Sequence, residues 1–116
     1  MAIGIPGVDE NGFDDLYDGD KELYVSVLHS FLDKTPSVLS KLAKVSNDTL
    51  PDYATTVHGL KGALAAVCAE EHRKAALELE KFSRSGNLAG VQAKNGAFLK
   101  SVEELLENIQ QWFKRH

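Results

Sequence analysis

Apolar residues recur every three or four positions along most of this 116-residue chain, and no stretch of useful length alternates apolar with polar residues. A period near 3.6 predicts amphipathic helices, whereas strands require a period of two. Each such helix has to bury its apolar face against a neighbour. The length suits one core built without disulfides or metals and leaves little room for a second one. The pattern therefore predicts an all-α fold in a single domain spanning residues 1–116.

The N-terminal stretch, residues 1–19, combines several glycines with many acidic residues. This composition predicts a loop or turn, while Phe13, Leu16 and Tyr17 would allow a short helix to dock on the core. We expect this lead-in segment to lie beside a helical bundle that occupies about residues 20–115.

Five segments with helical periodicity follow from Lys21 onward. Thr35 followed by Pro36 predicts the start of the second segment, because threonine caps helices and proline is tolerated in the first turn. The third segment is expected at about residues 50–68, after a polar break, and the fourth should end near Gly86. Apolar residues of the last three segments are Tyr53, Val57, Leu60, Leu64 and Val67, then Ala75, Leu79 and Phe82, then Val91, Phe98, Val102, Leu105, Ile109 and Trp112. Joined by short turns, such helices pack most simply as an antiparallel bundle.

Composition excludes several classes of protein. A formal net charge of −4 argues against nucleic-acid binding, which needs a surplus of lysine and arginine. The single cysteine, Cys68, rules out an intramolecular disulfide and suits a reducing compartment. The chain shows no signal-peptide pattern and no apolar run long enough for a membrane span. We expect a cytoplasmic protein without direct membrane contact.

The third segment places one histidine on its outer face. At about 100° per residue, His58 points roughly 135° away from the centre of the apolar stripe. Thr55, Gly62, Ala65 and Ala69 are predicted to share that face, and Lys61 falls at its boundary.

A lone surface histidine on a helix usually has no function, but the neighbouring glycine needs an explanation. Gly62 lies one turn after His58, and a glycine inside a helix costs about 0.5–1 kcal/mol relative to alanine. Access for a partner to the imidazole would justify that cost. Lys61 would offset negative charge brought to the histidine, although an ordinary boundary lysine would have the same pattern.

The sequence His58-Gly59-Leu60-Lys61-Gly62 resembles the H-x-L-K-G signature of histidine-containing phosphotransfer domains. The likeness continues on the fourth segment and in the lead-in, at Leu79-Glu80, Arg84-Ser85-Gly86, residues 5–9, residues 19–24 and Phe31. One departure is Cys68, which stands ten residues after the histidine where the family usually has glycine, and which is followed by the expected Ala69. We interpret Cys68 as a packing substitution near the helix end, which leaves the following turn in doubt.

The resemblance implies a four-helix bundle with a short N-terminal helix beside it. It implies that His58 is phosphorylated on its outward Nε2, that Lys61 helps to hold the phosphoryl group and that Gly62 leaves room for a partner. Thr55, Ala65 and Ala69 would complete the docking patch. The expected partner is a response-regulator receiver domain, which would supply Mg²⁺ and an aspartate, so no cofactor is expected on this chain.

The same resemblance indicates a phosphocarrier of the type found at the C-terminus of hybrid sensor histidine kinases. The chain has no P-loop and no glycine-rich kinase loop, so we do not expect an enzyme with its own nucleotide site. The sensor, the receiver and the direction of phosphoryl flow remain open.

Two alternatives fit parts of the pattern. A di-iron type of metal-binding bundle needs Glu-x-x-His pairs. No histidine here has a glutamate three residues earlier, so no metal is expected. The second alternative is a phosphorylation-independent adaptor that docks a partner protein. The presence of His58, Lys61 and Gly62 together argues against it. We expect a monomer, because the apolar stripe of the last helix is needed to close the core.

Overall fold

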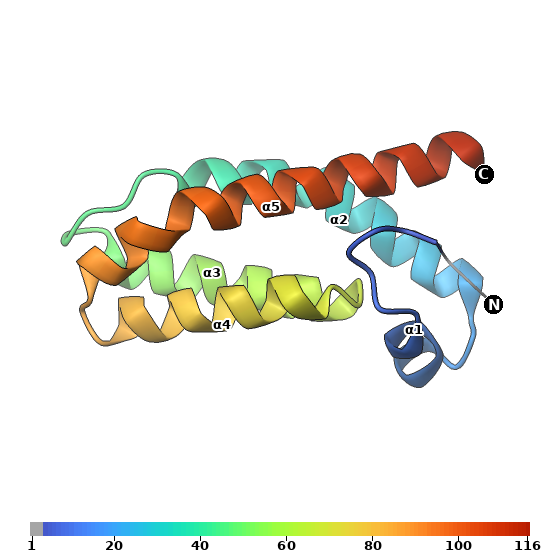
Figure 1. Ribbon diagram of the computed structural model, residues 1–116, viewed down its shortest axis with the longest axis horizontal. Coiled ribbons are helices and arrows are strands. Elements are labelled where there is room, and N and C mark those ends of the chain that lie inside the picture. Colours follow the sequence, from blue (N-terminus) through green and yellow to red (C-terminus); the bar gives the residue numbers. More distant parts are fainter. Residues whose placement is uncertain (1–3) are drawn as a thin grey trace.

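The computed structural model describes residues 4–116, which form five α-helices. Figure 1 shows the last four running alternately up and down as an antiparallel bundle, with the first one at one end. Their bounds are α1 Glu10–Tyr17, α2 Lys21–Leu42, α3 Leu50–Ala66, α4 Glu70–Arg84 and α5 Leu88–Arg115. The all-α prediction of a four-helix bundle with a short helix beside it is confirmed. Residues 1–3 of the predicted lead-in lie outside the described residues.

The two segments predicted between Lys21 and Val45 are one helix, so the boundary proposed at Thr35 and Pro36 was wrong. Thr35 is buried inside α2, only 3% exposed, and Pro36 lies on the exposed side of the same helix. Proline removes one backbone hydrogen bond from a helix interior. The buried face nevertheless continues through it without a break, at Tyr24, Leu28, Phe31, Thr35, Leu39 and Leu42. Continuing the helix buries the last two leucines, which compensates for the lost bond.

The core contains the apolar faces predicted for α3 and α5. Every residue assigned to these two stripes is buried. On α4 the buried face is Ala76, Leu79, Glu80 and Ser83, so Ala75, which is exposed, was wrongly placed on it. A carboxylate thus lies on the inward side of α4, where periodicity would suggest an apolar residue.

The turn between α3 and α4 corrects the prediction for Cys68. α3 ends at Ala66, and Cys68 adopts φ 65°, the left-handed conformation. The amide of Cys68 bonds to the Ala65 carbonyl and that of Ala69 to the Leu64 carbonyl. This is the Schellman arrangement, whose left-handed position usually holds glycine. Cys68 is therefore a turn residue in a conformation that disfavours side chains, and it is not part of the helix.

The lead-in segment and the first turn of α2 close the C-terminal end of α3. The backbone N–H of Asp9 donates to the Cys68 carbonyl at 2.7 Å. The hydroxyl of Tyr24 donates to the next carbonyl back along the chain, at 2.8 Å, and the hydroxyl of Tyr17 donates to the one before that, at 2.6 Å. Helix C-termini leave carbonyls without partners, so these donors satisfy an otherwise incomplete end.

The docking of α1 itself differs in part from the prediction. Phe13 is buried against the ring of Tyr24, with centroids 5.1 Å apart, and Tyr17 is half-buried. Leu16 is 58% exposed, so the expectation that it docks on the core was wrong.

The other end of the bundle is tied by a buried amide. Asn95 of α5 donates to the carbonyl of Leu42 at 2.9 Å and accepts from the hydroxyl of Tyr53 at 2.7 Å. One side chain therefore links α5 to the ends of α2 and α3. No helix among the described residues has the length and apolar character needed to cross a membrane.

Candidate functional site

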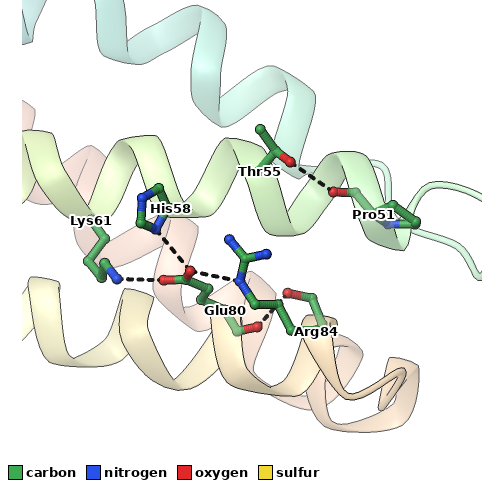
Figure 2. Close-up of polar contacts among 7 residues, drawn as sticks. Pro51, Thr55, His58, Lys61, Glu80 and Arg84 are labelled. Carbon is green, nitrogen blue, oxygen red and sulfur yellow. Dashed lines mark hydrogen bonds and ion pairs between the residues drawn. The ribbon is translucent and has the colours of Figure 1, made fainter.

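His58 lies in the middle of α3, between buried neighbours Val57 and Leu60. Its side chain is 58% exposed and points away from the core, as the helical periodicity predicted. Its Nδ1 contacts Oε2 of Glu80 on α4 at 2.9 Å. Figure 2 shows the imidazole held from the α4 side by this carboxylate.

Glu80 lies at the centre of a small charged cluster, although its own side chain is only 8% exposed. Besides contacting His58, it forms an ion pair with the Lys61 ammonium at 2.7 Å and accepts a hydrogen bond from Arg84 Nε at 2.9 Å. The Lys61 side chain is 22% exposed, and that of Arg84 is 54% exposed. Three separate groups therefore converge on one carboxylate (Figure 2).

These contacts keep Glu80 ionised. The Lys61 ammonium is the main cause, and burial opposes it. Hydrogen bonds from Arg84 and His58 add to the effect of Lys61, and together they lower the pKa of the Glu80 carboxyl from 4.5 to about 2. An ionised carboxylate at neutral pH can only accept hydrogen bonds.

The ionised carboxylate determines which histidine tautomer forms. Because Glu80 can only accept, Nδ1 of His58 carries the proton in this contact. In the neutral imidazole the lone pair is then on Nε2. A neutral imidazole nitrogen with a free lone pair is a competent nucleophile.

The surface next to His58 is nearly bare. A Cβ added at Gly59 or at Gly62 would meet no atom within 4 Å, so packing does not require glycine at either position. Thr55 is exposed one turn earlier, and its hydroxyl donates to the Pro51 carbonyl at 3.2 Å (Figure 2). Ala65 is half-buried.

Ala69 does not lie on this surface. It is fully buried at the start of α4, because the chain has already turned at Cys68. Its predicted place on the outer face was therefore wrong.

Glu80 and Arg84 are site residues that sequence reasoning had noted only as part of a family likeness. A local signal existed for Glu80, since it shares the buried face of α4 with Ala76, Leu79 and Ser83. A charged residue on such a face has to be paired. Its partners lie on another helix, so periodicity alone could not identify them.

The remaining histidines are held elsewhere. The ring of His29 stacks on Phe113 with centroids 4.2 Å apart, and His72 Nε2 lies 3.3 Å from the Ser101 carbonyl. His116 Nδ1 contacts the Trp112 carbonyl at 2.8 Å. Within residues 4–116 no group of three or more metal-binding side chains converges on one point.

Comparison with known proteins identifies the family. The family model for the Hpt domain matches residues 26–112, a span that contains His58, Lys61, Glu80 and Arg84. No curated protein and no solved structure matches the chain significantly. Because the match covers most of the chain, the protein belongs to the Hpt domain family, whose members are phosphocarrier modules that work with receiver domains and kinases in phosphorelays.

Proposed function

We propose that His58 accepts a phosphoryl group from the aspartate of a receiver domain and passes it to another receiver. The observation that carries this proposal is the contact between His58 Nδ1 and the ionised Glu80 carboxylate, which leaves the exposed Nε2 as the nucleophile. The Hpt domain family, to which the chain belongs, carries phosphoryl groups in phosphorelays.

The transfer breaks one bond and forms another. The bond between phosphorus and the aspartate carboxylate oxygen breaks, and the Nε2–P bond forms with the nitrogen lone pair. Because Nδ1 keeps its proton, the ring becomes positively charged as the new bond forms. Glu80 lies 2.9 Å from Nδ1 and offsets that charge. The aspartate leaves as a carboxylate.

Lys61 and Arg84 supply positive charge around Glu80, the carboxylate that contacts the His58 imidazole. Both are anchored on Glu80, at 2.7 and 2.9 Å, and both side chains remain partly accessible to solvent. A phosphoryl group adds about −1.5 to −2 units of charge at pH 7, which a neighbouring ammonium or guanidinium stabilises. We assign both residues to supporting the phosphoryl group.

The docking surface in this proposal is the bare face of α3. Gly62 and Gly59 leave room for the wall of a receiver active site, with Thr55 and Ala65 at its edge. In-line phosphoryl transfer also needs charge neutralisation, commonly by a metal. We propose that the receiver binds this Mg²⁺ next to its own aspartate.

The test is transfer from a ³²P-labelled receiver domain in the presence of Mg²⁺, comparing the parent with His58→Gln. The matched control is His29→Gln, which removes another exposed imidazole of the bundle. Acid-labile, base-stable label on the parent and on the control, but not on His58→Gln, is the expected result. Equal labelling of all three proteins would refute His58 as the site. Binding of receivers without label on any of them would favour the adaptor alternative.

A further inference from the structure

Residues 5–9 of the lead-in segment form a strap across one end of the bundle. The carbonyl of Pro6 accepts a hydrogen bond from the Asn108 side chain on α5 at 3.2 Å. The amide of Asp9 donates to the carbonyl of Cys68, in the turn between α3 and α4, at 2.7 Å. The strap therefore connects α5 to the turn that follows α3.

His72, in the first turn of α4, packs against this strap. A Cβ added at Gly7 would lie 3.3 Å from Cε1 of the His72 ring and 3.2 Å from Cδ1 of Leu105 on α5. Gly7 also has φ 92°, a backbone conformation that suits glycine. The strap thus approaches the imidazole as closely as a glycine allows, and the ring lies between the strap, α4 and α5.

The imidazole of His72 has one buried nitrogen without a partner. Its Nε2 lies 3.3 Å from the carbonyl of Ser101 on α5, and because a carbonyl can only accept, Nε2 carries the proton in this contact. Nδ1 then holds the lone pair, and it is buried without a hydrogen-bond partner within residues 4–116. A second proton on Nδ1 would therefore have no acceptor, and burying an unpaired charge is costly.

The charged groups on the elements around the ring do not pair with it. No ion pair within the described part of the chain includes His72. On α4, Glu71 is 87% exposed and pairs with Lys74, and Arg73 pairs with Glu70. The charged residues nearest in position on the other two elements are exposed; they are Lys100, Glu104 and Glu107 on α5, and Asp9 and Glu10 where the strap meets α1.

We propose that His72 is an acid-sensitive latch for the strap, and that protonation of its Nδ1 releases residues 5–9 and uncovers the Cys68 thiol. An imidazole in water takes up its second proton near about pH 6.5. Because the released state can bind this proton and the docked state gives it no acceptor, docking is favoured above this pH and weakens as the pH falls. The latch does not depend on the role proposed for His58.

Cys68 is positioned to report this release. The strap leads directly into α1, and a Cβ added at Gly12 of α1 would lie 3.2 Å from the Cys68 Sγ. Only 7% of Cys68 is exposed, so α1 covers the thiol while the strap is docked. Since the chain contains a single cysteine, any thiol label identifies this position.

The experiment measures the rate at which dithiodipyridine labels Cys68 at pH values from about 8 down to about 5, on either side of the range in which imidazoles titrate. The parent is compared with His72→Gln, which keeps a neutral donor for the Ser101 carbonyl and cannot be protonated. The matched control is His29→Gln, which removes an imidazole that stacks on Phe113.

The ratio of parent to variant rates cancels the intrinsic pH dependence of the thiol. We expect the ratio of parent to His72→Gln to rise on the order of tenfold over this fall in pH, and the control to follow the parent. A ratio that stays constant with pH would overturn the proposal.

Two further measurements separate release of the strap from unfolding. Gly7→Ala should displace the strap at every pH, because the added Cβ meets the ring, so its Cys68 should be labelled rapidly with little further gain in acid. Continued protection of Cys68 in this variant would refute the link between strap and thiol. In hydrogen exchange, the Asp9 amide should lose protection in acid in the parent but not in His72→Gln, while the Val102 amide inside α5 stays protected. Equal loss at both amides would mean global unfolding and would overturn the latch.

Discussion

Replacing Gly62 should separate stability from function. Gly62 lies inside α3 with nothing within 4 Å of the position that a Cβ would occupy. Changing it to alanine or glutamine should therefore stabilise the helix by about 0.8 kcal/mol, since no clash offsets the propensity gain. For a domain of this size, this gain corresponds to a rise in Tm of about 3–4 °C.

The same change should impair transfer from a receiver. A helical side chain leans toward the N-terminus, so glutamine at position 62 would extend toward His58, one turn earlier. Displacing a reacting group by about 1 Å can slow a reaction by two orders of magnitude. We expect Gly62→Gln to slow receiver-dependent labelling on the order of 100-fold, and Gly62→Ala to slow it less.

Gly96 provides the matched control, because it lies inside α5, is exposed and also has open space around its Cβ position. Gly96→Gln should raise Tm by a similar amount without slowing transfer. Phosphoramidate, a donor too small to meet the added side chain, should label the Gly62 and Gly96 variants alike. Parent-like transfer in Gly62→Gln would refute the access argument. Equal loss of transfer in the two glutamine variants would show that helix stiffening, and not access, is responsible.

Three further predictions concern two buried polar residues, Glu80 and Asn95. Glu80→Gln should slow phosphoryl transfer about tenfold, because the charged hydrogen bond to the imidazole becomes a neutral one, while Glu78→Gln, an exposed change on the same helix, should not alter the rate. The depressed pKa of Glu80 means that its contacts contribute stability above about pH 4.5 that is lost as the pH falls toward about 2. Urea unfolding should therefore find Glu80→Gln less stable than the parent by about 1–2 kcal/mol at pH 7, a value reduced to allow for the exposure of its arginine partner. At about pH 2 the two proteins should be nearly equal in stability. A stability difference that stays constant with pH would contradict this linkage. Asn95→Ala should lower the free energy of unfolding by about 3 kcal/mol, because it leaves the Tyr53 hydroxyl and the Leu42 carbonyl buried without partners. A loss below about 1 kcal/mol in urea unfolding would mean that water replaces the amide.

The sequence-based predictions that the structure confirms rest on helical periodicity. In a helix, the residues that share a face are determined by their spacing along the chain, which is a local property. The inward faces of α3 and α5, and the outward direction of His58, follow from it. Local turn chemistry also placed the end of α4 near Gly86, which has φ 75°.

The predictions that failed depended on competition between local preference and packing. Thr35 followed by Pro36 has the local signature of a helix start, yet the helix continues because Leu39 and Leu42 are buried by doing so. Cys68 has the apolar character of a helix residue, yet it occupies a left-handed turn position that glycine would favour. Neither balance can be evaluated until the neighbouring helices are in place.

The sequence by itself determined the all-α class, the helical faces and the exposed histidine beside Gly62, because each rests on residues within a turn or two of one another. Only the tertiary structure brought Glu80 to His58, across 22 residues, and the Tyr17 hydroxyl to the end of α3, across 49. These contacts form between helices whose relative rotation is determined by core packing. Sequence spacing does not encode that rotation, so the candidate nucleophile could be identified from the sequence, whereas its contact with the Glu80 carboxylate could not.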